Sequence, residues 1–326
     1  MKFNAFWIEK SDDGVNQSVI ERNVDDLPEG DVLIDVAYSS LNYKDGLSAT
    51  GAPGVTRNYP HTPGIDASGR VAESSDSKFA VGDEVVVIGF DLGMNTAGGF
   101  GEKIRVPSNW VVKVPEGLDL HSIMIIGTAG FTAAECVQKL ESAGVTKDSG
   151  PVLVTGATGG VGSVAVKLLA QLGHEVHAVT GKPDHKDFLE SLGAAQIMSR
   201  EQVLEGVDKP LLKEVWGGVV DTVGGDMLFN AVKGLRYGGS LAACGLVGGA
   251  NFSASVLPFI LRHVNLLGVD SVQLPVDQKE AIWTRLGSDW KLDLTSLEET
   301  LTLDTLPNAI ERILKGEMVG RGVLHL

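Results

Sequence analysis

Residues 152–172 read VLVTGATGGVGSVAVKLLAQL, and this stretch decides the fold. Val152–Thr155 is an apolar run that predicts a buried strand. The apolar residues of Val161–Leu172 recur at helical spacing, and Gly173 follows them as a stop signal, so this segment predicts a helix. The glycines at 156, 159 and 162 form a GxxGxxG turn between the two. Strand, glycine-rich turn and helix in this order predict the first half of a βαβ unit.

The same alternation of strands and helical stretches continues on the C-terminal side as far as about residue 269. Six strands separated by helices are typical of a complete doubly wound parallel sheet, a Rossmann domain in the α/β class. The predicted strands are Val152–Thr155, Val176–Thr180, Gln196–Met198, Gly218–Thr222, Ser240–Cys244 and Asn265–Val269.

The first 120 residues have a different rhythm, with short apolar runs separated by many prolines and glycines. This pattern predicts an irregular β domain. Its predicted strands are Phe3–Glu9, Asp31–Ser39, Ala67–Ala72, Asp83–Ile88, Lys103–Val106 and Trp110–Val114.

The segment beyond Asp270 is mainly polar, with one amphipathic helix predicted near 306–315 and a last strand at Val323–Leu326. One helix and one strand bury too little surface to fold alone, so we expect this tail to pack onto the first domain. The predicted organisation is a catalytic and substrate domain over 1–122, a nucleotide-binding domain over 123–265, and a return segment over 266–326 that completes the first domain.

Composition excludes several classes of function. The net charge is −15 with no cluster of basic residues, which argues against nucleic acid as a partner. Two cysteines cannot build a four-thiolate zinc site or a disulfide framework. No long uncharged apolar run suggests a membrane span, and the run Ala5–Ile8 is too short for a signal-peptide core, so we expect a cytoplasmic protein with no membrane contact.

The glycine turn predicts a dinucleotide site, because close backbone approach and a helix N-terminus suit a pyrophosphate. The alternative interpretation of this glycine-rich segment is a flexible surface turn without a ligand. NAD-specific domains usually carry an acidic residue at the end of the second strand. Here Thr180, Gly181 and Lys182 stand at that place, and Arg200 follows the third strand. Lys182, Thr180 and Arg200 suit the 2′-phosphate of NADPH, unless the two cations are only solvated surface charges.

Several segments resemble the medium-chain dehydrogenase/reductase superfamily. They are PGIDASG (63–69), VGDEV (81–85), GGFGE (98–102) and GTAGFTA (127–133). Longer phrases are more similar to the acrylyl-CoA reductase branch of the zinc-free, quinone-oxidoreductase-like enzymes. These are SSLNYKD (39–45), MIIGTAGFTA (124–133), AACGL (242–246), and PFILR (258–262) followed by GVDSV (268–272). The resemblance implies a GroES-like fold for the first domain.

Zinc-dependent members of that superfamily hold their metal with Cys, His and an acidic residue. This sequence has Asn42 and the run Gly64–Asp66 where those ligands would fall, so we expect no metal. The resemblance implies NADPH-dependent reduction of the conjugated C=C bond of acrylyl-CoA to propionyl-CoA by hydride transfer.

The resemblance also implies a set of cofactor contacts, of which the glycines and Lys182 are supported by the physical argument above. Tyr43 is the one candidate for a catalytic role, and its alternative is packing at a domain surface. Asn42 and Asp45 orient substrate or cap local backbone. The implied contacts are Tyr43, Gly159, Gly160, Val161, Gly162, Thr180, Gly181, Lys182, Arg200, Leu246, Ile260, Ser271 and Arg321. By default, apolar residues at strand ends such as Leu246 and Ile260 belong to the core, and Arg321 is equally consistent with an exposed side chain.

Two other functions remain open at this point. One is an NADPH:quinone oxidoreductase, and the other is a cofactor-binding protein without turnover. A CoA substrate requires cations for its phosphates, for which Lys44, Arg57, Arg262 and Arg321 are candidates. The seven histidines are dispersed and are interpreted as structural or exposed, and Cys136 and Cys244 as buried spectators. An edge strand such as Asn265–Val269 suits pairing with a second copy, and we expect a homodimer.

Overall fold

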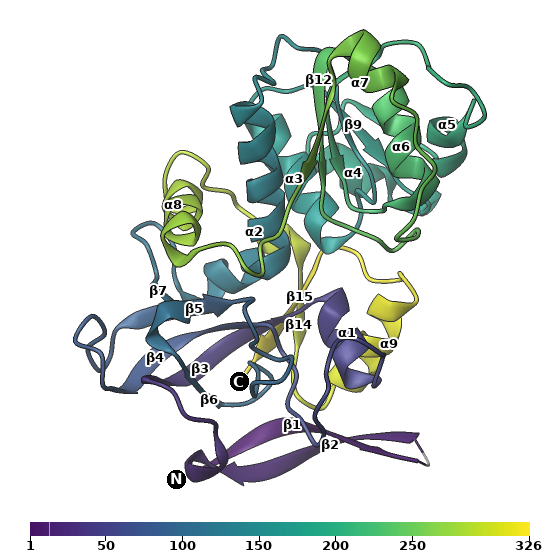
Figure 1. Cartoon of the computed structure of the whole chain (residues 1–326). Helices are drawn as coiled ribbons and strands as arrows, with labels where there is room; N and C mark the ends of the chain where they lie inside the picture. Colours follow the sequence, from purple (N-terminus) through teal and green to yellow (C-terminus); the bar gives the residue numbers. More distant parts are fainter. Residues whose placement is uncertain (13) are drawn as a thin grey trace. The chain divides into compact units, whose positions relative to one another are not determined.

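The computed structural model describes residues 1–12 and 14–326, which fall into two compact units (Figure 1). The first unit comprises Met1–Thr128 and Ser271–Leu326, and the second comprises Ala129–Asp270. The first unit is therefore discontinuous in sequence, because the C-terminal segment packs with the N-terminal residues.

The second unit is built on a six-stranded parallel sheet in the order β10-β9-β8-β11-β12-β13. Numbered along the chain from β8, this order is 3-2-1-4-5-6, the arrangement of a Rossmann domain. The six predicted strands are all present, and the expected α/β class is confirmed. Their bounds are β8 Val152–Val154, β9 Val176–Val179, β10 Gln196–Met198, β11 Trp216–Asp221, β12 Leu235–Ala243 and β13 Asn265–Gly268.

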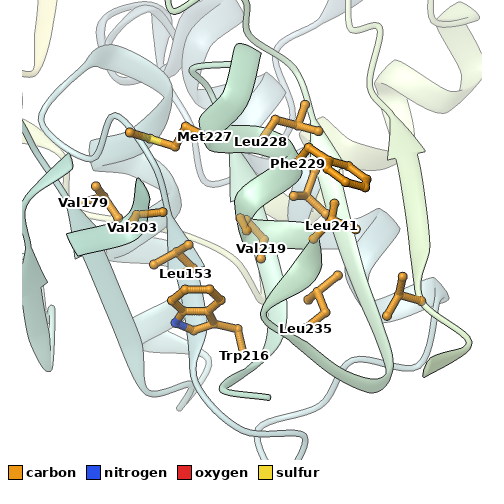
Figure 2. Close-up of a cluster of buried hydrophobic side chains, with 13 residues drawn as sticks. Leu153, Val179, Val203, Trp216, Val219, Met227, Leu228, Phe229, Leu235 and Leu241 are labelled. Atoms are coloured by element: carbon orange, nitrogen blue, oxygen red, sulfur yellow. The ribbon is translucent and has the colours of Figure 1, made fainter. Parts of the chain in front are cut away.

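Helices connect these strands, and their apolar faces close the core on the sheet. The buried side chains of Leu153, Val219 and Leu241 lie on the central strands, and Met227 and Phe229 of α6 belong to the same cluster (Figure 2). Because central parallel strands are covered on both faces, they are apolar without alternation. The connecting helices are α3 Gly160–Gln171, α4 Lys186–Ser191, α5 Arg200–Leu204, α6 Gly225–Lys233 and α7 Leu257–Arg262.

The first unit contains a seven-stranded sheet ordered β14-β15-β3-β4-β5-β7, with β6 also paired to β3, and a separate β1-β2 hairpin. The inward residues Val32, Ile34 and Val36 of β3 alternate along the strand and pack with Val85 and Val87 of β5. The strands are β1 Lys2–Ser11, β2 Gly14–Asn23, β3 Val32–Leu41, β4 Asp66–Ser74, β5 Glu84–Ile88, β6 Lys103–Val106, β7 Val111–Lys113, β14 Glu298–Leu301 and β15 Arg321–His325.

The C-terminal tail has more regular structure than the sequence suggested. The expectation of one helix and one strand is wrong, because the polar stretch also forms α8 (Val276–Gly287) and β14. In α8 only Ile282, Trp283 and Leu286 among the large apolar residues are buried, a narrow stripe that its many charged neighbours obscure. The predicted helix is α9 (Leu306–Leu314), and β15 pairs antiparallel with β3.

The helix α2 (Leu120–Ser142) is long and apolar enough to cross a membrane by length and composition, and 89% of its most apolar window is buried. A buried core helix passes the same test. Its backbone is also not continuous, because Gly127 has φ +51° and ψ −164°, which separates two helical stretches. This break has a function in the site described next.

Candidate active site

The glycine-rich turn joins β8 to α3 in the second unit. Gly156 has φ +61°, and a Cβ on Gly162 would lie 2.3 Å from the carbonyl oxygen of Gly156, so both positions require glycine for the chain's own packing. Gly159, the N-cap of α3, differs, because a Cβ there would meet nothing closer than 3.4 Å. The protein itself does not require glycine at 159, whereas a pyrophosphate seated on this helix N-terminus does.

The carboxyl end of β9 gathers the residues predicted to bind a 2′-phosphate. The Thr180 hydroxyl lies 3.3 Å from that of Thr158 and accepts a hydrogen bond from the Lys182 amide at 3.0 Å. A Cβ on Gly181 would lie 2.5 Å from Nε of Arg200, so the Arg200 guanidinium lies against Gly181. The structure therefore brings the Thr180 hydroxyl, the Lys182 backbone and the Arg200 guanidinium to the same end of β9.

A polar cluster at the switch point of the sheet was not predicted. Asp221 at the end of β11 is buried and accepts hydrogen bonds from the Thr155 hydroxyl at 2.7 Å and the Gly224 amide at 2.8 Å. Burial raises the pKa of Asp221, and these hydrogen bonds oppose the rise. The cluster ties the glycine turn to the loop after β11. Its only signal in the sequence is an acidic residue at the end of an otherwise apolar strand.

Leu246 lies in the loop after β12, and Ile260 lies on α7. The default expectation that they belong to the core is wrong, because they are 62% and 69% exposed. Large apolar side chains so exposed indicate a surface that contacts another molecule. Val161 and Gly160 at the start of α3 are half-buried.

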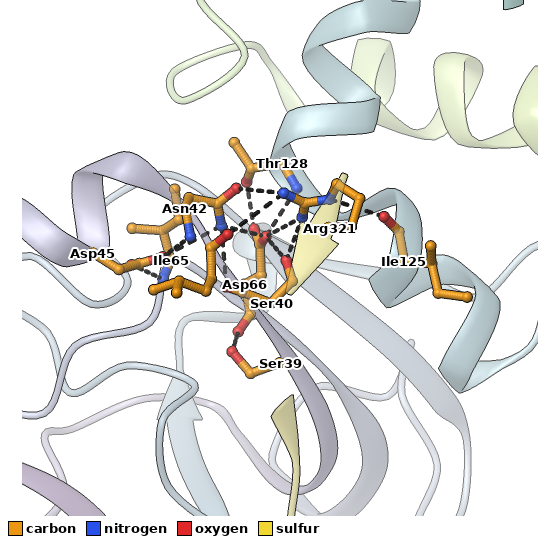
Figure 3. Close-up of polar contacts among 10 residues, drawn as sticks. Ser39, Ser40, Asn42, Asp45, Ile65, Asp66, Ile125, Thr128 and Arg321 are labelled. Carbon is orange, nitrogen blue, oxygen red and sulfur yellow. Dashed lines mark hydrogen bonds and ion pairs between the residues drawn. The ribbon is translucent and has the colours of Figure 1, made fainter. Parts of the chain in front are cut away.

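A buried polar network in the first unit surrounds the Asp66 carboxylate (Figure 3). Asp66 accepts hydrogen bonds from the Ser40 hydroxyl, from Nδ2 of Asn42 at 2.8 Å, and from the amide at 2.9 Å and the hydroxyl of Thr128. The guanidinium of Arg321 lies 4.0 Å from it. Four hydrogen-bond donors and a nearby guanidinium therefore surround this one buried carboxyl group.

Arg321, at the start of β15, is therefore not an exposed side chain; it is 2% exposed. Its Nε donates to the Ile125 carbonyl at 3.0 Å, and its Nη2 donates to the Ser40 hydroxyl at 2.8 Å. Burial lowers the pKa of Arg321, and the charges of Asp66 and Asp45 oppose that effect. The residue holds the network together within the first unit.

The break in α2 at Gly127 makes this network possible. A Cβ on Gly127 would lie 2.4 Å from Oγ of Ser40 and 2.6 Å from Nη2 of Arg321. The irregular backbone also frees the Thr128 amide and the Ile125 carbonyl for Asp66 and Arg321. Glycine is needed here both for its positive φ and for the close approach of side chains.

Next to the network, Asn42 and Asp45 cap the short helix α1 (Tyr43–Ala49). Asp45 accepts hydrogen bonds from the amides of Asn42 and Ile65, each at 2.8 Å. The capping role left open from the sequence is therefore present. Burial and the neighbouring Asp66 raise the pKa of Asp45 to about 7. Tyr43, at the first position of α1, is exposed.

These residues do not fit a catalytic zinc. The positions of the family's ligands hold Asn42, Ile65 and Asp66, which offer neither a thiolate nor an imidazole. Both oxygens of Asp66 already accept hydrogen bonds, and a guanidinium faces them. A metal ion at this position would have to displace the Arg321 guanidinium, so these residues do not form a zinc site.

The cations considered for a CoA substrate separate into two groups. Arg262 pairs with Glu214 and donates to the carbonyls of Lys233 and Leu212, and Arg321 is engaged in the Asp66 network. Lys44 is half-buried and Arg57 exposed.

Three further residues singled out in the sequence are at least half-buried. Ser271 is buried. Cys136 is buried, and Cys244 is half-buried. The hydrogen bond with Cys244 and, second, burial both raise the pKa of the Cys136 thiol, as expected for an unreactive thiol.

Two family models match the chain, the alcohol dehydrogenase GroES-like domain over residues 28–116 and the zinc-binding dehydrogenase model over residues 160–285. Fold and site thus define an oxidoreductase with a GroES-like domain and a dinucleotide-binding domain. The acrylyl-CoA reductase AcuI of Ruegeria pomeroyi is 47% identical, with 99% of each chain covered. The chain belongs to the acrylyl-CoA reductase family of quinone-oxidoreductase-like enzymes, in the medium-chain dehydrogenase/reductase superfamily.

Two further relatives bear on the cofactor. The putative quinone oxidoreductase YhfP of Bacillus subtilis is 45% identical over 99% of both chains, and its structure with NAD bound has a TM-score of 0.97 with 100% of each chain covered. The structure of the yhdH oxidoreductase from Salmonella enterica in complex with NADP has a TM-score of 0.95 at 43% identity, with 99% of each chain covered.

Proposed function

We propose that this protein is an NADPH-dependent acrylyl-CoA reductase that works without a metal. NADPH supplies a hydride to the β-carbon of the conjugated double bond, and a proton adds to the α-carbon, which gives propionyl-CoA and NADP⁺. The observation that carries the proposal is the Asn42–Asp66–Arg321 network, because it replaces a metal's ligand set with a hydrogen-bonded ion pair. Acceptors activated by conjugation to a carbonyl suit such a site better than alcohols that need a Lewis acid.

The chain's own residues bind and orient the reactants in this scheme. The N-terminus of α3 with Gly159 and Gly160 receives the pyrophosphate, and Lys182 and Arg200 receive the 2′-phosphate. Tyr43 is exposed beside the Asp66 network and is the candidate for contact with the nicotinamide and for proton relay. Leu246 and Ile260 offer exposed apolar contacts to the cofactor. The proposed set also includes Val161, Gly162, Thr180, Gly181, Ser271 and Arg321, the last of which is already engaged in the Asp66 network.

An acceptor panel tests the reaction. The purified protein is mixed with NADPH and, in turn, acrylyl-CoA, crotonyl-CoA and a benzoquinone, while the absorbance of NADPH is followed, and each assay is repeated with NADH. We expect rapid oxidation with NADPH and acrylyl-CoA. Turnover with the quinone alone would support the quinone oxidoreductase suggested by the Bacillus relative. Tight NADPH binding without any turnover would support a non-catalytic cofactor-binding protein.

Cofactor preference is tested at the end of β9. Lys182→Ser and Arg200→Ser each remove a charged hydrogen-bond donor, worth about 1.5–3 kcal/mol. We expect the KM for NADPH to rise roughly tenfold to a hundredfold while that for NADH changes little. Lys186→Gln on α4 is the matched control, because Lys186 is a nearby exposed lysine that pairs with Glu190. Equal effects on both cofactors would contradict the 2′-phosphate assignment.

The substrate class is tested on the first unit. We propose that Lys44 and Arg57 meet the phosphates of CoA, since Arg262 and Arg321 are engaged internally. Lys44→Gln and Arg57→Gln are expected to raise the KM for acrylyl-CoA and to spare quinone reduction. Lys78→Gln removes an exposed lysine elsewhere as a control. Equal changes with both acceptors would argue against an enoyl-CoA substrate.

We further propose a cytoplasmic homodimer. β13 is an edge strand of its sheet, and Leu266 on this strand is exposed. Pairing of β13 with the same strand of a second copy would cover the open sheet edge beside Leu266. Size-exclusion chromatography with light scattering measures the mass in solution. Leu266→Lys is expected to shift a dimer toward monomer, and a monomeric wild-type protein would overturn the proposal.

A further inference from the structure

Three side chains from distant parts of the first unit converge on one point. His121 lies at the start of α2, Glu298 begins β14, and His325 ends β15. The Nε2 atom of His121 is 3.0 Å from the Glu298 carboxylate, and that of His325 is 3.1 Å from it. One ligand atom from each residue lies within 4.8 Å of the others. None of the three belongs to the proposed active site.

The spacing matches what a small transition-metal ion requires. Zn²⁺ binds imidazole nitrogen and carboxylate oxygen at about 2.0–2.2 Å in tetrahedral geometry, which places neighbouring ligand atoms about 3.3 Å apart. The two nitrogen–oxygen distances, 3.0 and 3.1 Å, fall close to that value, and an ion between the side chains would replace the hydrogen bonds that join them. Two imidazoles and one carboxylate also form a ligand set that zinc sites use.

The surroundings hold the three side chains in place. The ring of Tyr38 on β3 lies with its centroid 5.0 Å from each of the two imidazole rings. The hydroxyl of Thr300 donates to Glu298 at 3.3 Å, as groups around metal sites orient their carboxylates. Glu298 is 12% exposed, whereas the imidazoles of His121 and His325 are 36% and 39% exposed. The carboxylate is fixed, and an open side remains for water.

We propose that His121, Glu298 and His325 form a binding site for one divalent transition-metal ion, Zn²⁺ or Co²⁺, with water at the remaining position. The ion would join the start of α2 to the β14–β15 pair. Its role would be structural, because the ligands lie outside the residues assigned to the cofactor and the substrate.

Direct binding tests the site. Untagged protein is treated with a chelator, exchanged into metal-free buffer and titrated with ZnCl₂ by calorimetry and with CoCl₂ by visible absorption. We expect one ion per chain, a Co²⁺ spectrum of low coordination number, and a rise in Tm on adding Zn²⁺, because the ligands converge only in the folded protein. No saturable binding of either ion would overturn the proposal.

Matched variants separate this site from chance binding. His121→Gln and His325→Gln each remove one ligand, so we expect Zn²⁺ affinity to fall by about tenfold or more and the Tm shift to disappear. His263→Asn is the control, because His263 is an exposed histidine elsewhere, with positive φ that asparagine tolerates. Circular dichroism and NADPH affinity check that each variant is folded. Undiminished Zn²⁺ binding in both ligand variants would overturn the proposal.

Discussion

Two alanine substitutions in the glycine turn should have opposite effects on stability and cofactor binding. A Cβ at position 162 would lie 2.3 Å from the Gly156 oxygen and 2.7 Å from the Ala157 Cα, so backbone must move. Overpacking of this kind costs about 1–3 kcal/mol, and alanine recovers about 1 kcal/mol in a helix. We therefore expect Gly162→Ala to lower the free energy of unfolding by up to about 2 kcal/mol.

Gly159→Ala should leave the folded protein as stable as before or slightly more so. Its backbone has φ −80° and ψ 175°, which alanine adopts without strain, so a gain of about 0.4–1 kcal/mol from the stiffer unfolded chain offsets the similar cost of alanine at an N-cap, and little net change is expected. The methyl group would instead occupy the space where a pyrophosphate approaches, and we expect NADPH to bind at least about tenfold more weakly.

Urea unfolding of the cofactor-free protein and NADPH fluorescence titration measure the two effects separately. The argument predicts a stable variant with weak binding for Gly159→Ala and a destabilised one for Gly162→Ala. A Gly159→Ala protein that binds NADPH as tightly as wild type would refute the assignment of this glycine to the cofactor. A Gly162→Ala protein clearly more stable than wild type would refute the packing argument.

Three further substitutions test buried charges in the first unit by urea unfolding. Arg321→Met leaves Asp66 without the cation 4.0 Å away, so a loss of about 3–5 kcal/mol is expected, and a loss under about 1 kcal/mol would show that the guanidinium does not stabilise this network. Because the pKa of Asp45 is about 7 in the folded protein, well above its ordinary value of 3.8, the folded protein holds this proton more tightly than the unfolded chain does. The free energy of unfolding of wild type, taken relative to that of Asp45→Asn, is then highest below pH 4. It falls as the pH rises to 7, by up to about 1.4 kcal/mol per pH unit. An increase of this difference with pH would disprove the raised pKa. Lys279 donates to the Ile88 carbonyl at 2.7 Å, so Lys279→Met should cost about 1–3 kcal/mol, whereas no loss would show that water replaces the ammonium.

The sequence predicted the Rossmann unit well because its signals are local. Strand, glycine turn and helix follow one another within residues 152–172, and apolar runs mark each later strand. The strand β2 was missed because its residues are only half-buried and alternate weakly. The helix α8 was missed because a narrow apolar stripe lies among charged residues. For Leu246 and Ile260, predicted as cofactor contacts, the exposure of both side chains rules out only the default alternative of core burial.

The polar sites escaped prediction for a different reason. The network around Asp66 joins residues 40–45, 66, 125–128 and 321, and no periodicity relates segments so far apart. His121 and His325 likewise appear dispersed in the sequence, yet both reach Glu298. The sequence did supply one local sign, the GTAGFTA segment, whose first glycine is the residue that interrupts α2. A glycine inside an apolar helical pattern thus indicated a close approach without revealing its partner.

Charge balance links the buried network to the proposed chemistry. Two carboxylates, Asp45 and Asp66, are buried with one guanidinium, Arg321, so full ionisation would leave one uncompensated negative charge. The raised pKa of Asp45 relieves that excess, since the residue takes up a proton near neutral pH. Asp66 and Arg321 are each held by several hydrogen bonds from the surrounding residues. Such a network fixes the start of α1, where Asn42 and Asp45 cap the helix directly beside Tyr43.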